Sequence, residues 1–145
     1  MKVNIKKLFD NAIVPTRGSR EAAGYDLYAY LEEPTLLIPA HCTRMIRTGI
    51  SLEIPDGYFG GLYPRSGIAT KKGLRPANCV GIIDSDYRGE IKVALHNDCD
   101  DARVIQNGER IAQLIIQPYL AVEFIEAEVL SNTERGAGGF GHTGS

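Results

Sequence analysis

The chain has 145 residues and a formal net charge of −2, with 43% hydrophobic and 23% charged residues. This length suits one domain with its own core, and the composition excludes a disordered chain. The small charge argues against stable nucleic-acid binding, although a few local arginines could bind a small anion. No apolar run approaches the roughly 18 residues of a membrane helix, and residues 1–8 alternate instead of forming a secretion signal. We therefore expect no membrane partner and a cytoplasmic location, or a nuclear one if the source is eukaryotic or viral.

The cysteines and histidines form no recognisable site. The three cysteines are widely spaced: Cys42, Cys79 and Cys99. An odd number at this spacing matches neither a disulfide framework nor a zinc pattern, and it indicates a reducing compartment. The three histidines are also scattered: His41, His96 and His142. A transition-metal site therefore has little support.

The predicted elements are short strands that glycine and proline separate. Apolar runs, several of them alternating, predict strands over residues 3–8, 25–29, 36–38, 45–54, 58–63, 79–83, 90–95, 110–116 and 121–129. The best helix candidate follows Ser66, over residues 67–72, and ends at Gly73. Many short strands with frequent turns predict an all-β barrel or sandwich. We expect a single domain over residues 1–145, with a core at 1–134.

Asp26 lies within an otherwise apolar predicted strand, between Tyr25 and Leu27. A carboxylate there needs a cation, a donor or the water shell of a metal. Further along, residues 63–69 predict a strand that ends at Pro64 and a helix that begins after Ser66. Ser66 is a plausible N-cap, and Arg65 beside it could form a forked contact with phosphate oxygens. Capping alone would also account for Ser66.

Residues 81–90 predict a hairpin in which a polar turn separates two apolar strands. Asp84 directly follows two isoleucines, and a partly desolvated carboxylate at that edge would suit a general base. A solvated turn is the simpler interpretation of this segment, but it explains less well Tyr87 within the turn and an Asp directly after the two isoleucines. In the last predicted strand of the core, Gln113 shares a face with apolar residues. It is therefore either bonded to backbone or presented to a ligand.

The segment 135–145 differs from the rest because it contains five of the 16 glycines. Such a segment loses much entropy on ordering and should be mobile when alone. Four other side chains stand among the glycines: Arg135, Phe140, His142 and Thr143. They make an anion-binding and aromatic set on a flexible arm, whereas a frayed terminus is the simpler alternative.

Five segments together resemble the motifs of the trimeric deoxyuridine triphosphatase (dUTPase) family. They are AGYDLYA at 23–29, PRSGIA at 64–69, GIIDSDYRGEI at 81–91, ERIAQLI at 109–115 and RGAGGFGHTG at 135–144. The resemblance implies a jelly-roll-like β-barrel with one short helix, assembled as a homotrimer that builds each active site from all three subunits. It implies hydrolysis of dUTP to dUMP and pyrophosphate with Mg²⁺, which limits uracil incorporation into DNA and supplies dUMP for thymidylate synthesis.

The same resemblance implies a nucleoside site on the hairpin. Backbone groups of Gly81 and Ile83 would bind the uracil edge, and Asn78 would assist. Tyr87 would lie against the deoxyribose and leave no room for a 2′-hydroxyl. Asp84 would bond the 3′-hydroxyl or orient the attacking water as general base.

It also implies a phosphate site. Arg65, Ser66 and Gly67 would contact the α- and β-phosphates beside Gln113, and Asp26 would contact the metal through water. The arm would close as a lid from another subunit, with Phe140 over uracil and Arg135 on phosphate charge. Thr143 and its neighbour Gly141 would bind the γ-phosphate. His142 is included among the substrate-binding residues without an assigned role.

Other functions remain open at this level. A dCTP deaminase-type relative would keep much of the framework, and a catalytically silent module would sense nucleotides or bind a partner. A purely structural trimeric β-domain would not need the glycine-rich arm. The presence together of Asp84, Arg65, Gln113 and Arg135 favours an active enzyme, and these four are the predicted catalytic residues.

Overall fold

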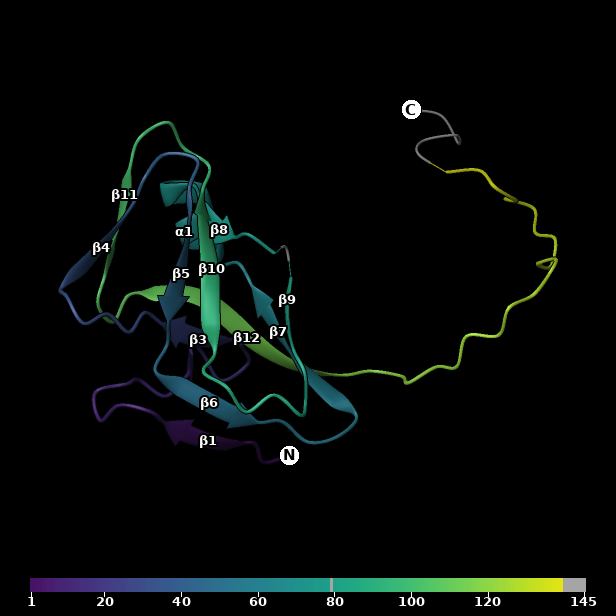
Figure 1. The fold of residues 1–145 in the computed structure, drawn as a ribbon, viewed down its shortest axis with the longest axis horizontal. Coiled ribbons are helices and arrows are strands. Elements are labelled where there is room, and N and C mark those ends of the chain that lie inside the picture. The colour runs from purple at the N-terminus through teal and green to yellow at the C-terminus, as the bar shows by residue number, and fades with distance from the viewer. Residues whose placement is uncertain (79, 140–145) are drawn as a thin grey trace.

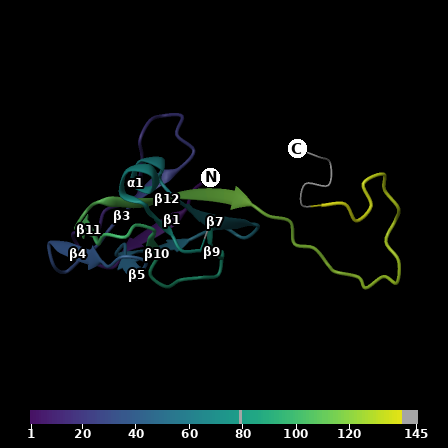
Figure 2. The same cartoon turned by 90° about the horizontal axis from the view of Figure 1, so that it is seen from above.

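The computed structural model describes residues 1–78 and 80–139 (Figures 1 and 2). Its strands are β1 (Asn4–Lys7), β2 (Thr16–Arg17), β3 (Tyr25–Tyr28), β4 (Thr35–Ile38), β5 (Thr43–Arg47), β6 (Ile50–Glu53), β7 (Tyr58–Tyr63), β8 (Leu74–Pro76), β9 (Gly81–Ile83), β10 (Lys92–Asn97), β11 (Arg103–Gln106) and β12 (Arg110–Pro118). The helix α1 (Ser66–Lys72) separates β7 from β8. The expected all-β, jelly-roll-like barrel with one short helix is confirmed.

The strands form four small antiparallel sheets around one aliphatic core. The largest sheet has the order β2-β3-β12-β7-β9, and the others are β5-β10-β8, β1-β6 and β11-β4. Among the fully buried side chains are Leu27, Ile38, Ile50, Leu95 and Ile111. Burial of such side chains stabilises the fold by about 1.5–3 kcal/mol each, so the sheets hold one another in place. The central strand of the largest sheet, β12, carries Gln113.

Most predicted strands are present, with shifted ends. The predicted strand over 45–54 is two strands, because the chain turns at Gly49, which has a φ of +70°. The short strands β2, β8 and β11 were not predicted, since two to four residues give too little periodicity. Over residues 1–78 and 80–139, no helix is long and apolar enough to cross a bilayer.

The prediction of a strand over residues 121–129 is wrong. These residues have no regular secondary structure, and the chain after β12 runs away from the barrel in both views (Figures 1 and 2). Phe124 is 94% exposed and Ile125 is 83% exposed. A strand needs a partner for its backbone groups, and this segment has left the sheets that could supply one. Its apolar composition resembled a strand, but no neighbour in the same chain pairs with it.

The prediction of a hairpin over residues 81–90 is also wrong in its pairing. β9 pairs with β7, whereas β10 pairs with β5 and β8. Residues 84–91 therefore cross from the largest sheet to the β5-β10-β8 sheet, and we call them the 84–91 loop. A short polar segment between two apolar runs fits both arrangements, because the pattern does not specify the partner strand.

Candidate functional site

One group of polar side chains surrounds the buried carboxylate of Asp26 on β3. The Nε of Arg65 donates to Asp26 Oδ1 at 2.6 Å, and Nη1 of Arg110 donates to Oδ2 at 3.3 Å. The Asp26 side chain is 11% exposed, whereas Arg65 is 25% and Arg110 is 51% exposed. Two arginines thus serve as cation partners of Asp26, and both guanidinium groups remain accessible to an anion.

The strand order brings Gln113 to this carboxylate. On β12, Gln113 is paired with Asp26 of β3 on one side and with Tyr63 of β7 on the other. Its Nε2 donates to the carbonyl oxygen of Pro64 at 2.9 Å, so the amide is bonded to backbone. Gly24 makes this placement possible, because a Cβ there would overlap the Oε1 of Gln113. We call Asp26, Arg65, Arg110 and Gln113 the Asp26 cluster.

Ser66 and Gly67 lie next to this cluster at the start of α1, and both are exposed. The prediction that Ser66 caps the helix is wrong, since Arg65 is the N-cap residue and no side chain caps the end. Ser66 is instead the first helical residue, and its carbonyl accepts from Thr70 Oγ1 at 2.7 Å. No atom lies within 4 Å of a Cβ built on Gly67, so the space beside this turn is open. The end of the helix is as predicted, with Gly73 at a φ of +63°.

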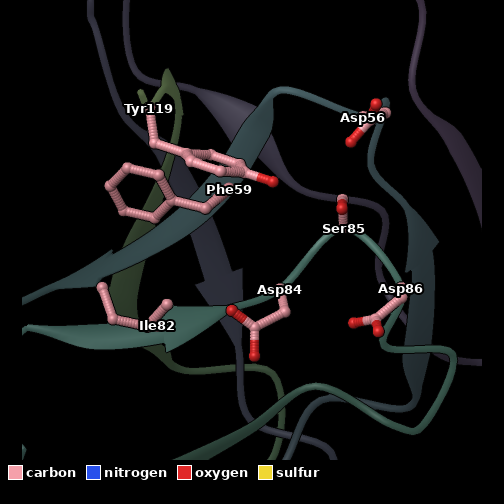
Figure 3. Close-up of a pocket in the computed structure, with 7 residues that line it drawn as sticks. All are labelled: Asp56, Phe59, Ile82, Asp84, Ser85, Asp86 and Tyr119. Atoms are coloured by element: carbon pink, nitrogen blue, oxygen red, sulfur yellow. The ribbon is translucent and has the colours of Figure 1, made fainter. Parts of the chain in front are cut away.

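The 84–91 loop lines two hollows in the surface. Figure 3 shows the larger, of about 620 Å³, with two aromatic rings on one side and the carboxylates of Asp84 and Asp86 on the other. Its lining is Asp56, Phe59, Ile82, Asp84, Ser85, Asp86 and Tyr119. The smaller hollow, of about 270 Å³, is lined by Met45, Ile82, Ile83, Asp84, Tyr87, Glu90 and Lys92. It brings together Ile83, Asp84 and Tyr87, three of the residues predicted to hold the nucleoside.

Asp84 is exposed in the single chain, so the expected partial burial of its carboxylate is not found. Asn78 and Gly81, also predicted to bind the nucleoside, lie together before the loop. The Nδ2 of Asn78 is 3.0 Å from the position of a Cβ on Gly81, and Gly81 itself is buried. The 84–91 loop therefore presents Asp84 at its entrance, with Asn78 and Gly81 just before it.

The Asp26 cluster and the 84–91 loop lie at opposite ends of β7. Ile83 faces Gly60, and Asp84 shares a hollow with Phe59 near the start of β7. Arg65 follows the other end of the strand, two residues after Tyr63. From Phe59 to Tyr63 a strand rises roughly 13 Å, at about 3.3 Å per residue. One chain therefore does not bring Asp84 and Arg65 together.

The described part of the arm, residues 135–139, stands apart from both groups. Arg135 donates from Nε to the carbonyl oxygen of Gly138 at 2.8 Å, within its own segment. In Figures 1 and 2 this part of the chain extends well away from the barrel. The remaining predicted arm residues lie outside the described residues: Phe140, Gly141, His142 and Thr143.

Sequence reasoning missed several residues that line these places. Arg110 was not among the predicted site residues, and the pairing of β12 with β3 is irregular between Arg110 and Ala112. Its charge could have been matched to Asp26 only with the strand order known. Met45 and Lys92 line the smaller hollow from the β5-β10-β8 sheet, and no local signal marks them. Over the described residues, no three His, Cys, Asp or Glu side chains gather in a way that could hold a metal ion.

Comparisons with known proteins agree with this arrangement. The dUTPase family model matches residues 10–144 of the chain. The deoxyuridine 5′-triphosphate nucleotidohydrolase of Nautilia profundicola is 49% identical over 99% of this chain and 99% of that protein. The mitochondrial deoxyuridine 5′-triphosphate nucleotidohydrolase of Dictyostelium discoideum is 45% identical over 97% of this chain and 75% of that protein.

Solved structures show the same likeness. A dUTPase of Staphylococcus bacteriophage 80alpha, solved with dUPNHPP, has a TM-score of 0.89 and 31% identity to this chain, and it covers 99% of both chains. The dUTPase of phage phi11 of S. aureus has a TM-score of 0.81 at 25% identity, over 92% of this chain and 100% of that chain. A family model that spans almost the whole chain, together with relatives of nearly half-identical sequence, shows that the chain belongs to the dUTPase family.

Proposed function

We propose that the chain hydrolyses dUTP to dUMP and pyrophosphate. The observation that carries this proposal is the pair of half-sites, one cationic and one with an exposed carboxylate beside an aromatic ring. Arg65 and Arg110 are held by Asp26 and remain partly exposed, while Asp84 and Tyr87 line a hollow at the other end of β7. A nucleoside triphosphate is a ligand that needs both groups at once.

The Asp26 cluster supplies the phosphate half of this site. Guanidinium groups bind phosphate oxygens through forked, charge-assisted hydrogen bonds. Asp26 fixes two of them before substrate arrives, so little reorganisation is needed when charge develops on the phosphates. Ser66, Gly67 and the amide of Gln113 lie beside these arginines and complete the donor set.

The 84–91 loop supplies the nucleoside half. Tyr87 packs against the deoxyribose and excludes an added 2′-hydroxyl by steric contact, while backbone groups of Gly81 and Ile83 bind uracil beside Asn78. Asp84 either orients the attacking water as general base or bonds the 3′-hydroxyl. A positioned base contributes typically 10²–10⁴-fold to such a step.

The active protein is a homotrimer with sites shared between subunits. The separation of Asp84 from Arg65 along β7 supports this, because a complete site needs the loop of one copy and the Asp26 cluster of another. The exposed apolar side chains beyond β12 support it as well, since such surface usually meets a partner. Closed rotational symmetry lets every copy give and receive the same parts.

The arm closes over the assembled site as a lid. Arg135 neutralises phosphate charge, Phe140 stacks on the base, and Thr143 with Gly141 binds the terminal phosphate. Closure excludes bulk water from the reacting phosphate. Ordering a glycine-rich segment costs conformational entropy, and the contacts of the closed arm offset this cost.

The residues of the Asp26 cluster fit a Mg²⁺ ion that is held chiefly by the substrate phosphates. Both oxygens of Asp26 already accept hydrogen bonds from arginines, yet a carboxylate has further lone pairs for a water in the ion's shell. Mg²⁺ prefers oxygen ligands, keeps several waters and binds chiefly through phosphates in many enzymes. When bound, it would neutralise charge on the phosphates, and Asp26 would orient it through water.

A cytoplasmic location is supported by the free thiols of Cys42 and Cys99, since reducing compartments keep such cysteines unpaired. A nuclear location is the alternative for a eukaryotic or viral source, and one of the relatives is named as mitochondrial.

Four nucleotides test the proposed function. Purified protein with Mg²⁺ should release pyrophosphate from dUTP and much less from dTTP, dCTP and UTP. Ammonia released from dCTP would instead show a deaminase-type enzyme. Nucleotide binding without any product would show a silent sensing module, and no binding at all would contradict both half-sites.

A further inference from the structure

An ion pair lies where the 84–91 loop enters β10. Both oxygens of Glu90 accept from the Nε of Arg47, at 3.1 and 3.0 Å, and Oε1 also accepts from the backbone N–H of Gly49 at 2.9 Å. The Glu90 side chain is 10% exposed, so its charge is largely removed from water. A carboxylate in that position needs its partners, because an unpaired buried charge is costly.

Arg47 is itself fixed from several sides. Its guanidinium lies 4.6 Å from the ring centroid of Phe9, and that ring stacks on Tyr30 at 4.4 Å. A cation over an aromatic face is stabilised by about 0.5–1 kcal/mol or more. The more exposed Glu32 accepts from Nη1 of Arg47 at 3.3 Å. The arginine therefore cannot follow Glu90 if the loop shifts, and it acts as a fixed anchor.

The backbone after Glu90 is held at the same place. The N–H of Ile91 donates to the carbonyl of Ile50 at 2.8 Å, and the buried hydroxyl of Thr48 donates to the carbonyl of Ile91 at 2.6 Å. Together with the Glu90 carboxylate, these bonds fix the end of the loop to the turn between β5 and β6.

Tyr87 is tied to that fixed point. Its hydroxyl donates to the carbonyl oxygen of Glu90 at 3.1 Å. Its ring lies against Gly89 so closely that a Cβ there would overlap the phenol. Glu90 and Tyr87 line the same hollow. The place of the Tyr87 ring therefore depends on where the backbone of Glu90 is held.

We propose that Arg47 and Glu90 are positioning residues that fix the Tyr87 ring for selection of deoxyribose over ribose. This inference rests on the proposed function, because it takes Tyr87 as the residue that excludes the 2′-hydroxyl. Neither Arg47 nor Glu90 needs to touch the nucleotide. Asp84 lies at the other end of the loop, next to the β9–β7 pairing, and the ion pair does not hold it.

The test compares Glu90→Gln and Arg47→Lys with Glu32→Gln. The first variant keeps the side-chain volume and removes the charge, the second keeps the charge and removes the Nε donor, and the third removes only the exposed partner of Arg47. The first two should lower the ratio of kcat/KM for dUTP to that for UTP by roughly tenfold, since a small misplacement of a binding group can cost up to about 100-fold. The kcat at saturating dUTP should stay within a few-fold of wild type, and Glu32→Gln should keep the wild-type ratio.

A double variant and a fold control complete the experiment. Glu90→Gln combined with Arg47→Lys should lower the ratio no further than either change alone, because both break the same contact. Oligomer mass and a single thermal transition confirm folding of each variant. An unchanged ratio in both single variants, or an equal fall in Glu32→Gln, would overturn the positioning role while leaving dUTP hydrolysis intact. Wild-type protein that released no pyrophosphate from dUTP would overturn the proposed function itself.

Discussion

The Asp26 cluster and the 84–91 loop differ in how the fold prepares them. The cluster lies on neighbouring strands of the largest sheet, and an almost buried carboxylate holds its two arginines. The loop joins two sheets and is exposed at residues 86–88, and its position depends on contacts at its ends. Strand register thus holds the region proposed to bind phosphate, whereas a few contacts at its ends hold the region proposed to bind the nucleoside.

One chain contains the residues proposed for both halves of the site but keeps them apart. Strand register fixes the cluster at one end of β7 and the start of the loop at the other. Neither can move to the other without breaking the core. In the proposed function, assembly completes the site, and variants in the two regions should have distinguishable effects.

The largest effect is expected from Asp84→Asn. The amide keeps the size of the side chain and cannot accept a proton, so kcat for dUTP should fall by roughly 10²–10⁴-fold. Oligomer mass and thermal midpoint should stay unchanged, because Asp84 is exposed. Turnover within a few-fold of wild type would rule out Asp84 as the essential base.

Removing the arm should have the next largest effect. A chain that ends at Glu134 keeps all the strands and should fold and assemble normally. It lacks the contacts that we propose for Arg135 and Phe140, so hydrolysis should fall by roughly 100-fold or more. Steady-state kinetics measure the loss of hydrolysis, and gel filtration measures assembly. Full activity in the truncated chain would contradict the proposed role of the arm as a lid.

Mixed oligomers test whether the two halves come from different copies. Neither Asp84→Asn chains nor Arg65→Ala chains alone should be active. If each site joins a loop and an Asp26 cluster from different copies, random mixed trimers should recover roughly a quarter of the wild-type sites. Sites built within one chain would recover nothing, and verified mixed trimers without activity would contradict sharing.

Mixed trimers can also test whether the arm of one subunit closes over the site of another. Mixed trimers of arm-less chains with Asp84→Asn chains should regain partial activity, because some sites would combine an intact Asp84 with an intact arm. If the arm closed over the loop of its own chain, no such site would form.

Tyr87→Ala should change selectivity more than rate. Without the ring, the 2′-hydroxyl of UTP meets no steric barrier, so discrimination between dUTP and UTP should fall by roughly tenfold or more. Competition between the two nucleotides measures the ratio. An unchanged ratio would show that Tyr87 does not select the sugar, and it would remove the basis for the role of Arg47 and Glu90.

The fold class followed from the sequence because short apolar runs with regular turns constrain a chain strongly. The strand over 58–63 was predicted at its observed ends, and the helix nearly so. Long-range pairing could not be read in this way. The pairing of β9 with β7, and the partnerless course of residues 121–129, depend on which strands meet, and local periodicity carries no such information.

The candidate site shows the same division. Asp26 was expected to need a cation, a donor or the water shell of a metal, and the resemblance placed Arg65 in the same phosphate site. Arg110 as second partner depends on an irregular register in β12. Glu90 sits within a recognised motif, but its role depends on Arg47, which lies 43 residues away in sequence. Contacts of that range become visible only with the fold.

The smallest expected effect comes from Gly24→Ala. This variant should alter the Asp26 cluster without altering the 84–91 loop. A Cβ on Gly24 would overlap the amide of Gln113, whose side chain can swing outward at the loss of its bond to Pro64. The protein should fold, while kcat/KM for dUTP should fall about tenfold because one phosphate-facing group is displaced. The ratio of kcat/KM for dUTP to that for UTP should not change, since the 84–91 loop lies at the other end of β7. Gly18→Ala is the matched control, because no atom lies within 4 Å of its Cβ. A changed sugar ratio in Gly24→Ala would show that the two regions are coupled within one chain, and that strand register alone does not keep them independent.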